Sequence, residues 1–268
     1  MMIIDSTRPQ RQPRGFTLME LLVVIVIVAA LAALAWSGSR TLITRARVIE
    51  SSANLRSLAA ANAVYLTDHG VYCPADDQSN NRRWHGARSS ASGRFDPTAG
   101  FLSPYLGKSM RVTTCPLFKA MVEGSASFEN GTGGYGYNAA YIGGLPGSPF
   151  DRTTRIRLSQ RAANVANPGH TVMFATTAYA VSTGLQEYPY CEPPFWDFGD
   201  GPSGSRPSPS VHFRANGSAI VAWCDGSVST VVSNKSRGGA NPHGGNPETH
   251  RLGWFGPEEN NGHWNPKN

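Results

Sequence analysis

One apolar run near the N-terminus constrains this chain more than any other feature. Residues 16–36 are 21 residues with a single ionisable side chain, Glu20. As a helix that rises about 1.5 Å per residue, the run would reach roughly 31 Å, enough to cross a bilayer core. Three arginines precede the run and none lies inside it. The positive-inside rule therefore predicts a cytoplasmic N-terminus and an exported C-terminal bulk.

Glu20 is unusual within this run. A charge in hydrocarbon costs roughly 3 kcal/mol even on the most lenient insertion scale, so the carboxylate needs a partner. Cleavage between Gly15 and Phe16 would create an α-amine one helical turn away. The same two groups would also pair between neighbouring staggered helices. We therefore interpret Glu20 as a register device, comparable to a polar group in a coiled-coil seam.

The residues around this position resemble a known signal. Gly-Phe-Thr-Leu-x-Glu, followed by a Leu/Val/Ile run and preceded by a basic leader, is similar to the prepilin-type N-terminal cleavage and methylation motif. That motif belongs to type IV pilins and type II secretion pseudopilins. The resemblance implies that a dedicated membrane peptidase cuts after Gly15 and N-methylates Phe16, and that Glu20 guides assembly.

The resemblance also implies a function and a location. It predicts a non-enzymatic subunit of a type IV pilus-like or type II secretion filament, with prepilin peptidase, other pilin or pseudopilin subunits and the bacterial inner membrane as partners. The chain would cross that membrane once, with a periplasmic head, before it enters an envelope or surface filament. A surface pilus, a secretion pseudopilus and a DNA-uptake fibre remain alternatives, as do a major and a minor subunit.

Two other interpretations of the apolar run compete with this one. A secretory signal peptide would end at Ala33-Leu34-Ala35 and be cleaved before Trp36. A plain single-pass anchor would keep Met1. In either case the protein would be an exported or membrane-anchored enzyme or carbohydrate-binding protein. The mature N-terminus distinguishes the three.

The whole chain divides into four predicted segments. We predict a cleaved leader over residues 1–15, a transmembrane assembly helix over 16–36, an amphipathic continuation of this spine helix over 37–70 and an exported head over 71–268. Ser37-Gly38-Ser39 predicts a break in the helix, and Gly70 predicts its end. The helical stripe expected to pack on the head is Leu42, Ala46, Ile49, Ala53, Leu55, Leu58, Asn62 and Tyr65.

The head is predicted to be α+β, with the spine helix packed on a small, mostly antiparallel sheet with long loops. Strands are expected at 171–176, 218–224 and 227–232, the last two joined by a two-residue turn at Asp225-Gly226. The strand over 218–224 is apolar on both faces and should be central. In the next strand, Val228, Thr230 and Val232 should share the inward face.

A second resemblance concerns the head. Many large pilin-like proteins carry a His, nine residues and then Asp-Gly, whereas twelve residues separate His212 from Asp225-Gly226 here. The resemblance therefore implies the hairpin at Asp225-Gly226 in this chain, but no role is expected for His212. Gly134-Tyr135-Gly136-Tyr137-Asn138 and Thr114-Cys115-Pro116 also look like features of such heads.

The cysteines carry a further prediction. None of the four forms a C-x-x-C pair. Export would favour at least one disulfide, with three possible full pairings, and four reduced thiols are the alternative. The candidates are Cys73, Cys115, Cys191 and Cys224.

No pattern predicts a catalytic, cofactor or nucleic-acid site. The net charge of +6 falls to +4 without residues 1–15, which carry three Arg and one Asp, and the other basic residues are scattered. Residues 131–136 fit G-x-G-x-x-G but lack a strand before and a helix after, so they predict a glycine-rich loop. Exposed loop positions are expected for His243, His250 and His263. Carboxylate and carbonyl oxygens of Asp197, Gly199, Asp200 and Gly201 are candidate calcium ligands, although an ordinary acidic turn is favoured.

Overall fold

The computed structural model describes residues 15–107, 114–119, 129–239, 241–242 and 244–268, with the backbone alone at 34–40. The chain divides into two compact units, residues 1–45 and 46–268.

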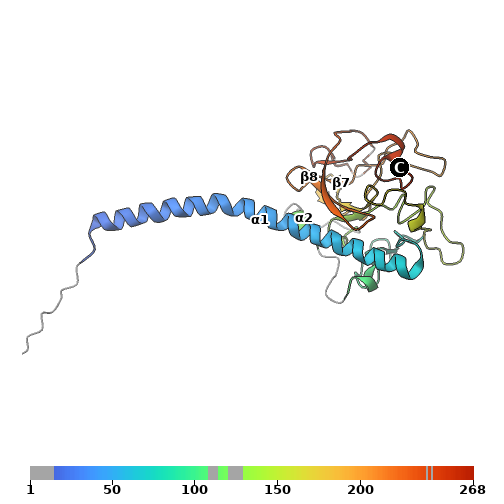
Figure 1. The fold of residues 1–268 in the computed structure, drawn as a ribbon, viewed down its shortest axis with the longest axis horizontal. Helices are drawn as coiled ribbons and strands as arrows, with labels where there is room; N and C mark the ends of the chain where they lie inside the picture. Colours follow the sequence, from blue (N-terminus) through green and yellow to red (C-terminus); the bar gives the residue numbers. More distant parts are fainter. Residues whose placement is uncertain (1–14, 108–113, 120–128, 240, 243) are drawn as a thin grey trace, which may run out of the picture. The chain divides into compact units, whose positions relative to one another are not determined.

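One helix, α1 (Leu18–His69), contributes to both units (Figure 1). It runs through Ser37-Gly38-Ser39, so the predicted break is not present. A helical Gly costs only about 1 kcal/mol relative to Ala, which a long helix of good formers tolerates. The helix ends at Gly70, whose φ is +73° and whose N–H donates to the Leu66 carbonyl at 2.8 Å. The predicted stop is confirmed.

In the first unit, the described side chains from Phe16 to Ala33 are all exposed. Within the described residues, no helix carries an apolar stretch long enough to cross a membrane, and the predicted span is not confirmed.

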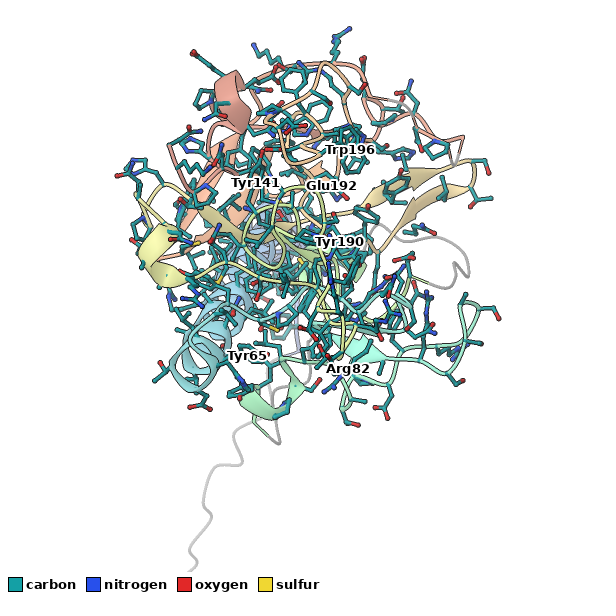
Figure 2. All side chains as sticks on the ribbon, turned by 90° about the vertical axis from the view of Figure 1, so that its right-hand side faces the viewer. Tyr65, Arg82, Tyr141, Tyr190, Glu192 and Trp196 are labelled. Atoms are coloured by element: carbon teal, nitrogen blue, oxygen red, sulfur yellow. The ribbon has the colours of Figure 1, made fainter. Side chains whose placement is uncertain are left out.

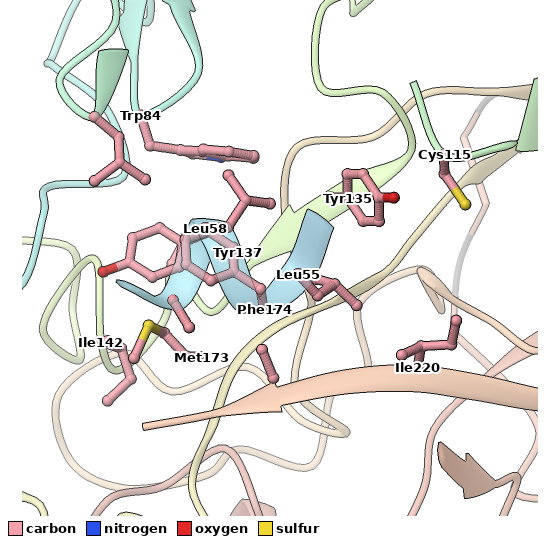
Figure 3. Packing of buried hydrophobic residues seen from close by; sticks show 14 of the residues in the cluster. Leu55, Leu58, Trp84, Cys115, Tyr135, Tyr137, Ile142, Met173, Phe174 and Ile220 are labelled. Carbon is pink, nitrogen blue, oxygen red and sulfur yellow. The ribbon is translucent and has the colours of Figure 1, made fainter. Parts of the chain in front are cut away.

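In the second unit, one face of α1 packs into the core. Leu55 and Leu58 are buried against Trp84, Tyr137 and Phe174 (Figure 3). These two positions and the buried Asn62 confirm the later part of the predicted stripe. Its earlier part is wrong, because Leu42 and Ile49 are 64% and 70% exposed. The side chain buried one turn before Leu55 is instead Ser51.

The main sheet has four antiparallel strands in the order β3-β4-β8-β9, which confirms an α+β fold. The strands are β3 (Tyr135–Tyr137), β4 (Val172–Thr176), β8 (Ser218–Trp223) and β9 (Val228–Val232). Both predicted hairpin strands are present, and β8 is central. The remaining elements are β1 (Arg82–Arg83), β2 (Gly86–Ala87), η1 (Ser103–Tyr105), α2 (Pro116–Lys119), η2 (Ala162–Asn164), β5 (Tyr179–Val181), β6 (Gly184–Gln186), β7 (Val211–His212), β10 (Leu252–Gly253) and η3 (Glu259–Asn261).

The turn between β8 and β9 differs from the prediction. The Gly226 N–H donates to the Trp223 carbonyl at 3.0 Å, and the Trp223 N–H donates to the Ser227 carbonyl at 2.9 Å. The loop is therefore three residues, Cys224 to Gly226, with Gly226 at φ +85°. This is the turn followed by a left-handed glycine that three-residue hairpins favour. In β9, Val231 packs on the core, while Thr230 is exposed and Val232 is 71% exposed, so the predicted inward face is wrong at Thr230 and Val232.

Three strands of the sheet, β3, β4 and β8, are buried on both faces. Ile220 and Ala222 of β8 belong to the cluster that contains Leu55 and Leu58 of α1. Their neighbours in β8 alternate to the other face, where the cluster includes Ala219, Val221, Trp223, Trp254, Phe255 and Trp264. The C-terminal segment thus forms the second cover of the sheet, which its Gly-, Asn- and Pro-rich sequence did not predict.

Candidate processing and assembly site

The proposed cleavage point lies in a short non-helical segment. Gly15, Phe16 and Thr17 precede α1, and Phe16 is 78% exposed. A Cβ added at Gly15 would meet no atom within 4 Å. The Gly15–Phe16 bond is therefore accessible in the described residues, and a larger side chain at Gly15 would not disturb the chain itself.

Thr17 and Glu20 form a reciprocal capping box at the start of α1. The Thr17 N–H and Oγ1 donate to Glu20 Oε2 at 2.9 and 2.8 Å, and the Glu20 N–H donates to Thr17 Oγ1 at 3.2 Å. This arrangement satisfies backbone donors that otherwise have no partner in the first helical turn. Its sequence signal is Thr-x-x-Glu directly before an apolar run.

Glu20 is the charged member of an otherwise apolar surface. Phe16, Met19, Val23 and Val24 line a shallow depression of ≈330 Å³ with it. In this uncleaved chain the carboxylate binds Thr17 rather than the predicted α-amine. The pairing of Glu20 with the amine of a processed Phe16 stays a prediction.

The comparison with known families bears on this segment. The family model of the prokaryotic N-terminal methylation motif matches residues 10–36. Residues 10–36 are a prepilin-type signal. This signal marks pilin-type structural proteins, which are generally not enzymes, and it associates the chain with the membrane or with an envelope filament. No curated protein and no solved structure matches the chain.

The predicted disulfide is not present. All four cysteines are free thiols, although three of them are buried. Their sulfurs have different surroundings: the Cys73 thiol donates to the Pro74 carbonyl at 3.4 Å, and Cys115 Sγ lies 3.2 Å from Ser51 Oγ. Cys224 is the half-buried one, and desolvation of its thiol raises its pKa to about 12 against the smaller lowering effect of a hydrogen bond with Tyr72. Cysteines far apart in the sequence pair only when folding brings them together, which their spacing does not reveal.

His212 has a structural role that its altered spacing did not predict. Its ring is 2% exposed, and its Nδ1 lies 3.0 Å from Nη1 of the buried Arg214. The Arg214 guanidinium also donates to the carbonyls of Gly134 and Thr177 and packs over the Phe118 ring. Arg214 therefore connects β7, the glycine-rich loop and α2 inside the core.

The remaining histidines and the acidic turn can also be placed. His263 is half-buried, with its ring centroid 5.4 Å from that of Trp223 and 5.8 Å from that of Phe255, so the prediction of an exposed loop position is wrong for it. His250 is partly exposed, and His243 lies outside the described residues. Both carboxylate oxygens of Asp197 are used by the turn itself: Oδ1 accepts the N–H groups of Gly199 and Gly201, and Oδ2 accepts the Tyr141 hydroxyl.

The glycine-rich loop binds a carboxylate of the same chain. Glu187 Oε2 accepts the N–H groups of Gly131, Thr132 and Gly133 at 2.7, 2.8 and 3.1 Å. Successive N–H groups that converge in this way form an anion-binding nest. A G-x-G-x-x-G sequence thus binds an internal carboxylate of this chain.

We expect Glu187→Ala to lower the free energy of unfolding by about 2–3 kcal/mol, because three N–H groups lose a charged acceptor. Glu187→Gln should cost less, since its amide oxygen still accepts. The matched control is Glu248→Ala, because Glu248 is 52% exposed and pairs loosely with Arg237 at 3.4 Å. The control should stay within about 0.5 kcal/mol of the wild type in urea denaturation. Equal losses in both Ala variants would contradict a stabilising nest.

Proposed function

We propose that this chain is a structural subunit of a type IV pilus-like or type II secretion filament, processed after Gly15 and assembled through its N-terminal helix. The observation that carries the proposal is the prepilin-type signal at residues 10–36. Its position at the start of a helix with an exposed apolar surface supports the same conclusion.

The exposed surface of the first unit explains why such a segment needs an apolar environment. Leu18, Ile25 and Leu31 are 88%, 58% and 61% exposed, and their neighbours are similar. Full burial of one such side chain is worth about 1.5–3 kcal/mol. Contiguous apolar surfaces of this kind mark membrane or protein contacts. We propose that the inner membrane covers residues 16–36 first, and that helices of other subunits cover them in the filament.

The roles of the segments follow from this proposal. Residues 1–15 are the leader that prepilin peptidase removes on the cytoplasmic side. Phe16 becomes the methylated N-terminus, Glu20 sets the register of assembly, and residues 71–268 fold outside the cytoplasm as the head.

The mature N-terminus tests the proposal. In cells with a prepilin peptidase, intact-mass measurement should show a chain that begins at Phe16 and carries one added methyl group. Gly15→Leu should leave the full-length precursor in the membrane, because the larger side chain obstructs the peptidase and not the chain. A mature start at Trp36, or an intact Met1 in the wild type, would instead support an exported or anchored enzyme or carbohydrate-binding protein.

A further inference from the structure

We propose that a cleft on the head binds a neutral oligosaccharide. The cleft has a volume of ≈400 Å³ and lies where η2 and three loops, at residues 141–146, 197–201 and 260–267, come together. Small-molecule sites typically have volumes of roughly 300–1,000 Å³ and a few well-placed polar groups.

Neutral amide side chains dominate the polar lining of this cleft. They are Gln160, Asn164, Asn260 and Asn265. An amide offers both donors and acceptors. A sugar hydroxyl also donates and accepts, so a row of amides matches a row of hydroxyls.

The amides are held in place by one another. Asn164 Nδ2 donates to Gln160 Oε1 at 2.9 Å, and Asn265 Nδ2 donates to Asn260 Oδ1 at 3.1 Å. Gln160 is only 7% exposed, and neither its Nε2 nor Asn164 Oδ1 has a hydrogen-bond partner among the described residues. One donor and one acceptor are thus oriented before any ligand arrives, which lowers the entropic cost of binding.

The charge of the cleft argues for an uncharged ligand. The Asp197 carboxylate is occupied by Tyr141, Gly199 and Gly201. The other charged side chain in the lining is Lys267. A phosphate or an acidic sugar would require a cluster of cations, typically a bidentate arginine, and no such cluster lines this cleft among the residues that the structure describes.

Two exposed aromatic residues, Trp196 and Phe198, flank the cleft residue Asp197 in the sequence. Phe198 is 70% exposed and Trp196 is 38% exposed. Trp196 is labelled in Figure 2, as is Tyr141, whose hydroxyl lies 2.8 Å from Asp197 Oδ2. The apolar face of a sugar ring packs on an aromatic side chain.

A second cleft extends the site. It has a volume of ≈640 Å³, shares Asn260 with the first cleft, and is lined by Glu259 and by neutral amides such as Asn167 and Asn268. The two clefts together would accommodate several linked sugar rings, so the expected ligand is an oligosaccharide.

Isothermal titration calorimetry on the purified full chain tests this proposal. The detergent should be dodecylphosphocholine, because maltoside detergents present a competing sugar. The probes are cellohexaose, mannohexaose and maltohexaose. We expect at least one to bind with a Kd of about 1 mM or tighter. Phe198→Ala should weaken that binding roughly tenfold, as the loss of an aromatic contact predicts. Asn164→Leu should weaken it similarly.

Two matched controls keep the test specific. Val232→Ala removes an exposed apolar side chain from β9, and Gln78→Leu removes an exposed amide, both outside the clefts. Both should bind as the wild type does. Absence of binding to all three probes, or unchanged binding in both cleft variants, would overturn the proposal. Equal affinity for an uncharged Gly-Ser hexapeptide would show a peptide groove instead. Because binding is measured on the purified chain, its result is independent of filament assembly.

Discussion

Glu20→Gln is expected to be cleaved and to reach the membrane, yet to fail to join filaments with wild-type subunits. If Glu20 pairs with the α-amine of a neighbouring Phe16, neutralising the carboxylate leaves that amine without its partner among apolar helices. Removal of one member of a buried ion pair typically costs about 3–5 kcal/mol, which is several hundredfold or more in an association constant.

Because Glu20 belongs to a capping box, the Gln variant separates the loss of the charge from the loss of the helix cap. Gln at this position can still accept the hydrogen bonds from Thr17, because Glu and Gln both complete a capping box. Glu20→Leu loses both the cap and the charge. Thr17→Ala is the matched control, since it loses the cap, worth about 1 kcal/mol, but keeps the charge.

Co-expression with tagged wild-type subunits and recovery of sheared filaments would measure incorporation. Exclusion of both Glu20 variants, together with entry of Thr17→Ala, supports pairing through charge. If Glu20→Gln enters filaments while Glu20→Leu does not, the carboxylate acts as a helix cap and the pairing mechanism fails. The prepilin-type signal would stand in either case.

Acid is expected to destabilise the head below pH 6.5 more steeply than its carboxylates alone would explain. His85 is fully buried, and neither ring nitrogen has a hydrogen-bond partner among the described residues. Burial, followed by the charges of Arg83 and Arg88, holds the pKa of His85 well below its usual value. Glu129, which pairs with Arg83, is the nearby acidic group.

His212 adds to the same effect. Burial and the charges of Arg214, His250 and Arg251 lower the pKa of His212 to about 2. Both histidines therefore bind a proton in the unfolded chain near pH 6.5 but remain neutral in the folded one. The contribution of these neutral, buried histidines to the free energy of unfolding is fully present above pH 6.5. It is lost as the pH falls towards the pKa that each has in the folded protein. Each removes roughly 1.4 kcal/mol of unfolding free energy per pH unit in that window.

Urea denaturation between pH 7.5 and 5 measures this slope. His85 and His212 contribute roughly 2.7 kcal/mol per pH unit; His263, whose pKa is lowered by burial, adds to this slope, and Glu192, whose pKa is raised by burial, partly offsets it. Replacing His85 by Leu should lower the slope by roughly 1.4 kcal/mol per pH unit. Phe95→Leu is the matched control, because its ring centroid lies 4.7 Å from that of His85 and it does not titrate. An unchanged slope in His85→Leu would show that the folded protein accommodates the imidazolium.

Several features were readable from the sequence because their causes are local. The prepilin-type signal depends on residue types at fixed spacing around Gly15 and Glu20. The end of α1 at Gly70 follows from the left-handed conformation that glycine adopts without strain. The β8–β9 hairpin follows from two apolar runs around Asp225-Gly226. The capping box is equally local and was readable from Thr17 and Glu20.

Other features depend on contacts between distant segments, and only the tertiary structure decides them. The carboxylate of Glu187 binds a loop that starts 56 residues earlier, and the Arg214 guanidinium reaches a carbonyl 80 residues away. Neither pairing has a local signal, because an acidic or basic side chain looks the same in sequence whether solvated or buried. The burial of Trp254 and Trp264 was missed for the same reason. Spacing along the chain determines which residues begin a helix or a turn, whereas a buried charge or ring is specified by whichever segment folds against it.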